Sequence, residues 1–370
     1  MFLFVFVDSI AAFSYFNQRE ERFVSPSLRK NRNIYTDLLK NILLLFIGLS
    51  TIFFFTMNRS LYIIGIDGGA TKTTATLCAF DTTILAEAQG ESSNIQMVGV
   101  EHAAEIVLAL VHQCCHTVGC TISEIGAIVA GIAGVGRAAD QQQLFDAIAA
   151  LAQKKQLPFP PLGIESDARI ALEGAFSGKP GIIVIAGTGS IVLGSDANGA
   201  VHRSGGWGRS IGDEGSGYAI GREAFRVVAK VLDGSKIKTR LTKLFAHQLQ
   251  FNSQEAIIQA VYRNNFDLAS VVPLVLEAAA ANDAVAKNIL THAALELIET
   301  IALTANSFPT PNKERIPLSF AGSLLTNDNF YSRKVRATLK RTLPQLSPHM
   351  AEASPVIGAV LMAKDLAGAL

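Results

Sequence analysis

The stretch that decides the fold is LYIIGIDGGATKT, residues 61–73. Its first six residues form an apolar run of strand length, which stops at Asp67 and a glycine-rich turn. A second apolar run, TATLCAF at residues 74–80, leaves the turn. The same order returns at residues 181–194, where GIIVI meets AGTGS and IVLG follows. The chain therefore carries one type of hairpin twice, once in each half.

The chemistry of these turns suits a phosphate group. Glycine lets the main chain approach a ligand closely, and several N–H groups can then point at one phosphate. Asp67 ends a strand, where its carboxylate is placed to hold Mg²⁺ directly or through water. Either turn alone would indicate only a tight hairpin, and neither matches the P-loop or dinucleotide fingerprint. Two copies predict a shared nucleotide site. Its expected members are Gly68, Gly69, Thr71, Lys72, Thr73, Gly187, Thr188, Gly189 and Ser190.

Composition places the chain among globular proteins. It has 370 residues, of which 49% are hydrophobic and 17% charged, with a net charge of +1. This length predicts two or three domains, and so small a charge gives no field to attract nucleic acid or acidic lipid. The four cysteines show no zinc-site spacing, and an adjacent pair is a poor disulfide candidate. We expect reduced core thiols at Cys78, Cys114, Cys115 and Cys120.

Two more motifs follow the hairpins, GGWGRSIGDEGSG at residues 205–217 and SFAGSLL at residues 319–325. In this order the four motifs resemble those of the N-acetylglucosamine kinase and BadF/BadG/BcrA/BcrD-type ATPase family, part of the sugar kinase, actin and heat-shock-chaperone superfamily. The resemblance covers the chain from about residue 61 onward. It implies an α/β fold of two ribonuclease-H-like (actin-like ATPase) domains around a central nucleotide cleft. We expect these domains at residues 58–177 and 178–370.

The resemblance also implies a catalytic base. Asp167 closes the predicted strand LGIESD, residues 162–167, in front of a predicted helix. The family's catalytic aspartate occupies such a place, and a carboxylate there can accept the proton of an acceptor hydroxyl. The alternative for Asp167 is a helix N-cap, which aspartate often provides.

The remaining implied site residues divide between sugar and nucleotide. Gly206, Trp207, Asp213 and Glu214 are expected to bind the sugar, although Trp207 could be a core residue and Glu214 could favour the start of the next helix. Asn94, in SSN at residues 92–94, resembles the acceptor-binding asparagine, with a turn residue as the alternative. Gly131 and residues 134–136 are expected near the acetamido group. Gly322 and Ser323 are expected at the nucleotide.

The function that the resemblance implies is ATP-dependent transfer of a γ-phosphate to the 6-hydroxyl of N-acetylglucosamine, with Mg²⁺ as cofactor. A kinase for glucosamine or N-acetylmuramic acid is one alternative. A second is an ATPase activator of a reductase or dehydratase, which needs cysteine ligands for an iron–sulfur cluster shared by two subunits. A third is a non-catalytic sugar sensor, although no helix-turn-helix or basic segment precedes Leu61. A homodimer is a family expectation.

Residues 1–57 differ from the rest of the chain. An uncharged apolar run at residues 41–58 has borderline length for a membrane span, and it lies too far from the N-terminus for a signal sequence. Six basic residues precede this run, and of its near neighbours only Arg59 and Lys72 follow it, so the positive-inside rule would place the remaining chain outside the cytoplasm, where ATP is scarce. We therefore expect a cytoplasmic protein that starts at Met57, with a membrane anchor as the alternative.

Overall fold

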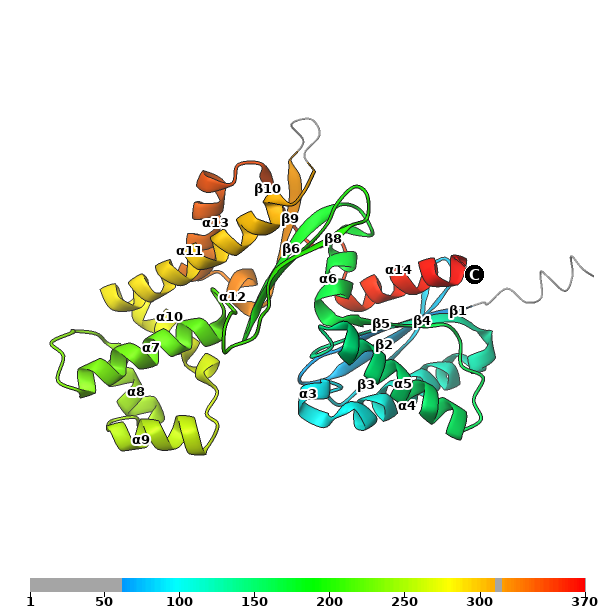
Figure 1. Cartoon of the computed structure of the whole chain (residues 1–370), viewed down its shortest axis with the longest axis horizontal. Helices are drawn as coiled ribbons and strands as arrows, with labels where there is room; N and C mark the ends of the chain where they lie inside the picture. The colour runs from blue at the N-terminus through cyan, green and yellow to red at the C-terminus, as the bar shows by residue number, and fades with distance from the viewer. Residues whose placement is uncertain (1–61, 310–314, 370) are drawn as a thin grey trace, which may run out of the picture. The chain divides into compact units, whose positions relative to one another are not determined.

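The computed structural model of the chain describes residues 62–309 and 315–369 (Figure 1). The predicted extension at residues 1–57 lies outside the described residues. Two five-stranded sheets organise the described part, with strand orders β3-β2-β1-β4-β5 and β10-β9-β6-β7-β8. The strands of the first sheet are β1 (Tyr62–Gly68), β2 (Thr73–Ala79), β3 (Ile84–Gly90), β4 (Ile125–Ile132) and β5 (Leu162–Ser166). Those of the second are β6 (Gly181–Ala186), β7 (Ser190–Ser195), β8 (Val201–Gly205), β9 (Ile316–Ala321) and β10 (Leu346–His349).

The two sheets repeat one topology. In the first, β1, β2 and β3 form an antiparallel meander, and β4 and β5 continue the sheet parallel to β1. In the second, β6, β7 and β8 form the meander, and β9 and β10 continue it parallel to β6. The predicted α/β fold with two ribonuclease-H-like halves is therefore confirmed. Both glycine turns join the first two strands of a meander, as predicted.

Helices connect and cover the strands. The helices of the first half are α3 (Ile95–Val98), α4 (Val100–Val118), η1 (Ile122–Glu124), α5 (Ala138–Lys154) and α6 (Asp167–Phe176). The helices that follow β8 are α7 (Gly217–Leu232), α8 (Leu241–Leu249), α9 (Gln254–Ile258), η2 (Gln259–Arg263), η3 (Leu268–Val271), α10 (Val272–Ala280), α11 (Ala284–Asn306), α12 (Ser323–Thr326), α13 (Phe330–Thr342) and α14 (Pro355–Gly368). Pro273 lies in the first turn of α10, where a missing N–H costs nothing.

Side chains alternate along each strand, and this alternation shows which core each face of a sheet contacts. On β1, Ile64 and Ile66 join the core formed with α4 and α5, while Ile63 faces the opposite side with α14. On β6, Ile182 and Val184 join the large core with the helices that follow β8, while Ile183 faces α6. Successive side chains of a strand point to opposite faces, so both sheets are covered on both sides. This explains why the central strands β1, β4 and β6 are almost continuously apolar.

Helix α6 packs between the two sheets. Its Ile170 joins the core of β1 and β4, while Leu172 and Phe176 join the core of β6 and β7. One helix therefore contributes to both halves, and its first residue is Asp167.

The C-terminal helix α14 packs on the first sheet, beside α6 and β1 (Figure 1). Close approach is possible because the contact is lined with glycine. A Cβ atom at Gly358 would lie 2.0 Å from Ile170 O, and one at Gly65 would lie 2.5 Å from Val360 N. Residues 355–368, which belong to the segment expected in the C-terminal domain, pack on the first sheet.

Helices α10 and α11 are apolar for a structural reason. Among the described residues no single helix is long and apolar enough to cross a membrane, but the bent pair Leu268–Ala280 and Ala284–Asn306 reaches the required length and composition together. Many of their apolar side chains, among them Val275, Leu290 and Leu297, are fully buried in the core of the second half.

Candidate active site

The backbone carbonyl groups of the second glycine turn, at residues 187–189, accept hydrogen bonds from a helix. The N–H groups of Gly217 and Tyr218, at the start of α7, donate to Gly187 O at 2.8 Å and to Thr188 O at 3.0 Å. A Cβ atom built on Gly187 would meet nothing within 4 Å, and its backbone needs no positive φ. Gly187 is therefore not required by packing, and its open side lets a ligand approach the main chain.

Two cavities meet at this turn. The first has a volume of about 1030 Å³ and the second about 550 Å³. Gly187, Thr188 and Asp267 line both cavities. Of the predicted site residues, the first cavity is lined by Asn94, Asp167, Gly187, Thr188, Gly189, Ser190, Gly206, Trp207 and Asp213. The second is lined by Gly187, Thr188 and Ser323.

Asp167 lines the first cavity, and its carboxylate is not the N-cap of α6. The N-cap of α6 is Ser166, whose Oγ accepts the N–H of Arg169 at 3.1 Å. Asp167 is the first helical residue, and its Oδ1 accepts the N–H of Ala168 at 2.8 Å. The side chain opens onto the cavity, yet the protein around it excludes enough water to raise the pKa of its carboxyl. The alternative N-cap role therefore belongs to Ser166.

Asp67 forms an acidic pair with Asp167. Burial, and then the charge of Asp167, raise the pKa of Asp67 to about 6, and Lys72 opposes this shift. Both acids stand near the ends of strands that flank β4 in one sheet. Asp67 of β1 pairs with Gly131 of β4, and Ile132 of β4 pairs with Ser166 of β5, the residue before Asp167. Two carboxylates that repel each other suit a divalent cation, which would remove the repulsion.

The donor set fits Mg²⁺ as kinases hold it. Mg²⁺ usually keeps several waters and takes one or two carboxylates together with substrate phosphates. In the part of the chain that the structure describes, no group of three or more His, Cys, Asp or Glu side chains could hold a metal ion. The Asp67 and Asp167 pair therefore suits a cation shared with a nucleotide rather than a cation held by protein alone.

Asn94 and the glycine-rich loop after β4 meet at the first cavity. The Oδ1 atom of Asn94 accepts the N–H of Gln96 at 3.0 Å, which makes Asn94 the N-cap of α3. Gly134 has φ +86°, and a Cβ there would lie 2.8 Å from Asn94 Oδ1. Gly134 and Gly136 line this cavity as the sequence predicted, whereas Gly131 packs against Ile170.

The loop at residues 206–216 contacts the turn at residues 187–190 through Asp213. Asp213 is buried with φ +62°, and the N–H groups of Ser190 and Gly208 donate to its carboxylate. Burial outweighs these bonds and raises the pKa of the carboxyl. Trp207 lies in the same loop, is 70% exposed and lines the cavity, so it is not a core residue.

Glu214 lies on the other side of this loop. It does not line either cavity, and its charge helps to raise the pKa of Glu296 on α11, whose burial is the larger cause. Its backbone carbonyl accepts the hydroxyl of Ser190 at 2.8 Å. The contact of Glu214 with this site is therefore through the main chain.

The first glycine turn lies outside both cavities. Thr73 is fully buried, with its Oγ1 2.7 Å from Glu91 O and 2.8 Å from Ser93 Oγ. A Cβ at Gly68 would lie 2.1 Å from Ser93 Oγ, so packing requires that glycine. None of Gly68, Gly69, Thr71, Lys72 and Thr73 lines the two cavities. Lys72 and Thr71 are exposed, and Lys72 acts on the site through its charge near Asp67.

Gly322 supports the turn at residues 187–189 from the strand side. It has φ +85°, and a Cβ there would lie 2.2 Å from Ala186 O. Only glycine allows α12 to start so close to the end of β6. Ser323, the first residue of α12, lines the second cavity.

Sequence reasoning missed several residues of both cavities. In the first, Arg203 on β8 donates to Gly206 O at 2.6 Å and to Gly136 O at 3.2 Å, which joins the two glycine-rich loops. In the second, Pro273 and Leu276 of α10 provide an apolar wall and residues 327–329 a polar wall. No short motif marks these positions, because they meet only when distant elements pack together.

Comparison with known proteins agrees with this geometry. The model of the BadF/BadG/BcrA/BcrD ATPase family matches residues 64–363. The N-acetylmuramic acid/N-acetylglucosamine kinase of Clostridium acetobutylicum is 33% identical over 307 residues, which cover 82% of this chain and 98% of that protein. The N-acetyl-D-glucosamine kinase of Dictyostelium discoideum is 30% identical over 83% of this chain and 98% of its own.

A solved structure shares the fold as well. A candidate N-acetylglucosamine kinase from Chromobacterium violaceum is 27% identical, with a TM-score of 0.64 over 82% of this chain and 99% of that one. The family model spans both sheets and every element that lines the two cavities. This chain is therefore a member of the BadF/BadG/BcrA/BcrD ATPase family.

Proposed function

We propose that the protein is an ATP-dependent kinase that transfers the γ-phosphate of ATP to the 6-hydroxyl of N-acetylglucosamine, giving N-acetylglucosamine 6-phosphate and ADP. The observation that carries this proposal is the meeting of two cavities at Gly187 and Thr188. A nucleoside in the second cavity would pass its phosphates over this turn into the first cavity. Asp167 and Asn94 line that cavity, where the acceptor sugar would lie.

The second cavity suits a nucleoside. Val272, Pro273 and Leu276 present apolar surface to one side, and Ser323 and residues 327–329 present polar groups to the other. A base has an apolar face and polar edges, and a ribose carries hydroxyl groups, so this combination can recognise both.

The turn at residues 187–189 binds the phosphates in this proposal. Its carbonyl groups are held by α7, and the missing side chain at Gly187 leaves room for the phosphate oxygens. Asp213 holds the turn by accepting the N–H of Ser190. We therefore assign Asp213 a positioning role in addition to any contact with the sugar.

Asp167 is the proposed base. Its carboxylate would accept the proton of the 6-hydroxyl as the oxygen attacks the γ-phosphorus and the bond to the ADP oxygen breaks. A raised pKa makes the carboxylate a better proton acceptor. Mg²⁺ would neutralise charge that develops on the phosphates. Asp67, with Asp167 beside it, is the residue that would hold the ion.

The sugar would contact the loops around Asn94 and Trp207. The Asn94 amide nitrogen can donate to a sugar oxygen, and the exposed Trp207 ring can cover an apolar face of the sugar. The relatives that act on N-acetylglucosamine support this acceptor, and the Clostridium relative also acts on N-acetylmuramic acid, as its name states.

A sugar panel tests the proposal. Purified full-length protein would be assayed for ADP production with ATP, Mg²⁺ and N-acetylglucosamine, N-acetylmuramic acid, glucosamine or glucose. We expect the highest kcat/KM with N-acetylglucosamine and a product that carries phosphate on O6 by phosphorus–proton NMR. Phosphorylation at O1 or turnover without any sugar would contradict the proposal.

The activator alternative is disfavoured by the state of the cysteines. Burial raises the pKa of Cys78 and Cys114 to about 11 and that of Cys115 to about 12, as expected for reduced core thiols. All four thiols are unpaired, and none lines either cavity. Iron analysis after anaerobic purification would revive this alternative if it found a stoichiometric amount.

A further inference from the structure

The polar wall of the second cavity is a tight corner between two helices. Residues 327–329 join α12 to α13, and all three line the cavity. We call residues 327–332 the α12–α13 corner. The short helix α12 has only four residues, so its own hydrogen bonds cannot fix where it ends.

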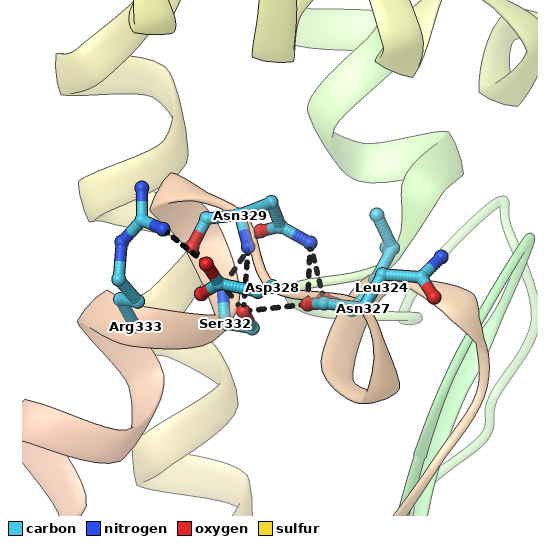
Figure 2. A network of polar contacts seen from close by, with 6 residues as sticks. All are labelled: Leu324, Asn327, Asp328, Asn329, Ser332 and Arg333. Carbon is cyan, nitrogen blue, oxygen red and sulfur yellow. Dashed lines mark hydrogen bonds and ion pairs between the residues drawn. The ribbon is translucent and has the colours of Figure 1, made fainter.

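The amide of Asn329 makes three hydrogen bonds in this corner (Figure 2). Its Nδ2 donates to Leu324 O at 3.1 Å and to Asn327 O at 3.0 Å, and its Oδ1 accepts the N–H of Ser332 at 2.8 Å. The opposite amide orientation would place Oδ1 against two carbonyl oxygens, so the hydrogen bonds determine the orientation. One side chain thus holds the end of α12 and caps the start of α13.

Ser332 completes the corner from the other side. Its buried hydroxyl donates to Asn327 O at 2.8 Å and accepts the N–H of Asn329 at 3.1 Å. The carbonyl of Asn327 therefore accepts hydrogen bonds from two side chains of the corner, Asn329 and Ser332. Arg333 pairs with Asp328 at 2.8 Å, but both side chains are exposed, so this pair adds little.

We propose that Asn329 is a positioning residue for the nucleotide. By fixing the carbonyl groups of Leu324 and Asn327, it sets the shape of the cavity wall against which the nucleoside packs. This inference rests on the proposed kinase function, because it assigns the second cavity to the nucleoside. The corner lines the second cavity and not the first, so its loss should weaken ATP binding and leave sugar binding unchanged.

The test uses a substitution that separates positioning from helix capping. Serine is as good an N-cap as asparagine and adds no charge near the phosphates, but it cannot donate to both carbonyls. In Asn329→Ser we expect the KM for ATP and the Kd for ADP to rise about tenfold. We expect the KM for N-acetylglucosamine and kcat at saturating ATP to stay within about twofold of the parent values.

Two further variants accompany this test. One is a control for stability, and the other tests the corner a second time. Ser253→Ala removes the N-cap of α9, which lines neither cavity, and should lower the melting temperature without changing the KM for ATP. Ser332→Ala keeps Asn329 but removes the second donor to Asn327 O, and we expect it to raise the KM for ATP as well. If Asn329→Ser does not fold, Ser332→Ala decides the question by itself.

The outcomes are distinct. An unchanged KM for ATP and an unchanged Kd for ADP in the folded variants would overturn the positioning role, as would an equal rise in the KM for the sugar. A parent protein that phosphorylates no sugar would refute the proposed function instead. In that case calorimetry with ADP still decides whether Asn329 shapes a nucleotide site.

Discussion

At the scale of single residues, the proposed chemistry depends on the acidic pair Asp67 and Asp167. Both acids were expected from the sequence, Asp67 as a metal ligand and Asp167 as the base. Their mutual repulsion was not, because it depends on how far apart two strand ends lie. The raised pKa of each carboxyl leads to two predictions.

The first prediction concerns Asp167→Asn. The amide cannot accept the proton of the sugar hydroxyl, so kcat should fall by about a hundredfold or more. ATP and N-acetylglucosamine should still bind, because Ser166 rather than Asp167 caps α6 and the helix start is preserved. Calorimetry with each ligand and a coupled ADP assay measure the two effects. Retained turnover would mean that another group is the base.

The second prediction concerns pH and Asp67. The folded pKa of about 6 lies above the value of 3.8 expected in the unfolded chain, so this group favours the folded state at low pH. That contribution is lost as pH rises through 6. Without ligands, Asp67→Asn should therefore raise the free energy of unfolding at pH 8 by about 1 kcal/mol and have little effect at pH 4. Urea denaturation at both pH values tests this sign.

At the scale of elements, the second hairpin is held as a rigid turn by α7 and by Gly322. Both glycine hairpins were predicted correctly, because strand period and turn composition are local signals. Their roles were predicted as equal, yet only the turn at residues 187–189 borders the two cavities. Composition cannot distinguish Gly68, which packing requires, from Gly187, which faces open space.

This difference predicts the result of Gly187→Ala. The added methyl group meets no protein atom within 4 Å and needs no strained backbone, so thermal stability should be unchanged. The methyl would lie where phosphates approach, and the KM for ATP should rise about tenfold. Unchanged ATP kinetics in this variant would place the phosphates elsewhere.

At the scale of the whole molecule, two elements join the halves of the described chain. Helix α6 packs between the sheets, and α14 packs beside α6 although it lies at the end of the chain. The glycines at this contact allow the backbones to approach closely. The sequence shows α14 only as an apolar helical segment, and nothing in its pattern indicates which sheet it covers.

A matched pair of substitutions in α14 tests this packing. Gly358→Ala would place a Cβ atom 2.0 Å from Ile170 O, and we expect a loss of about 1–3 kcal/mol in the free energy of unfolding. Gly368→Ala, in the same helix, meets nothing within 4 Å and should cost nothing. Denaturation of both variants by urea measures the difference. Equal stability would show that α14 does not pack tightly on α6.

The sequence by itself determined the features that depend on near neighbours in the chain. These are the two strand–turn–strand units, the strand that ends before Asp167 and the glycine turn between β9 and α12. Local backbone preference and the spacing of apolar residues encode them directly. The family motifs added the candidate acids and the loop that contains Trp207.

Only the tertiary structure decided which of these parts face one another. It brought the charge of Glu214 near Glu296 and placed Asn329 in the wall of the second cavity together with residues of α10. It also brought α14 back to β1. Each of these depends on the packing of segments far apart in the chain, where the sequence specifies the participants but packing determines which of them meet.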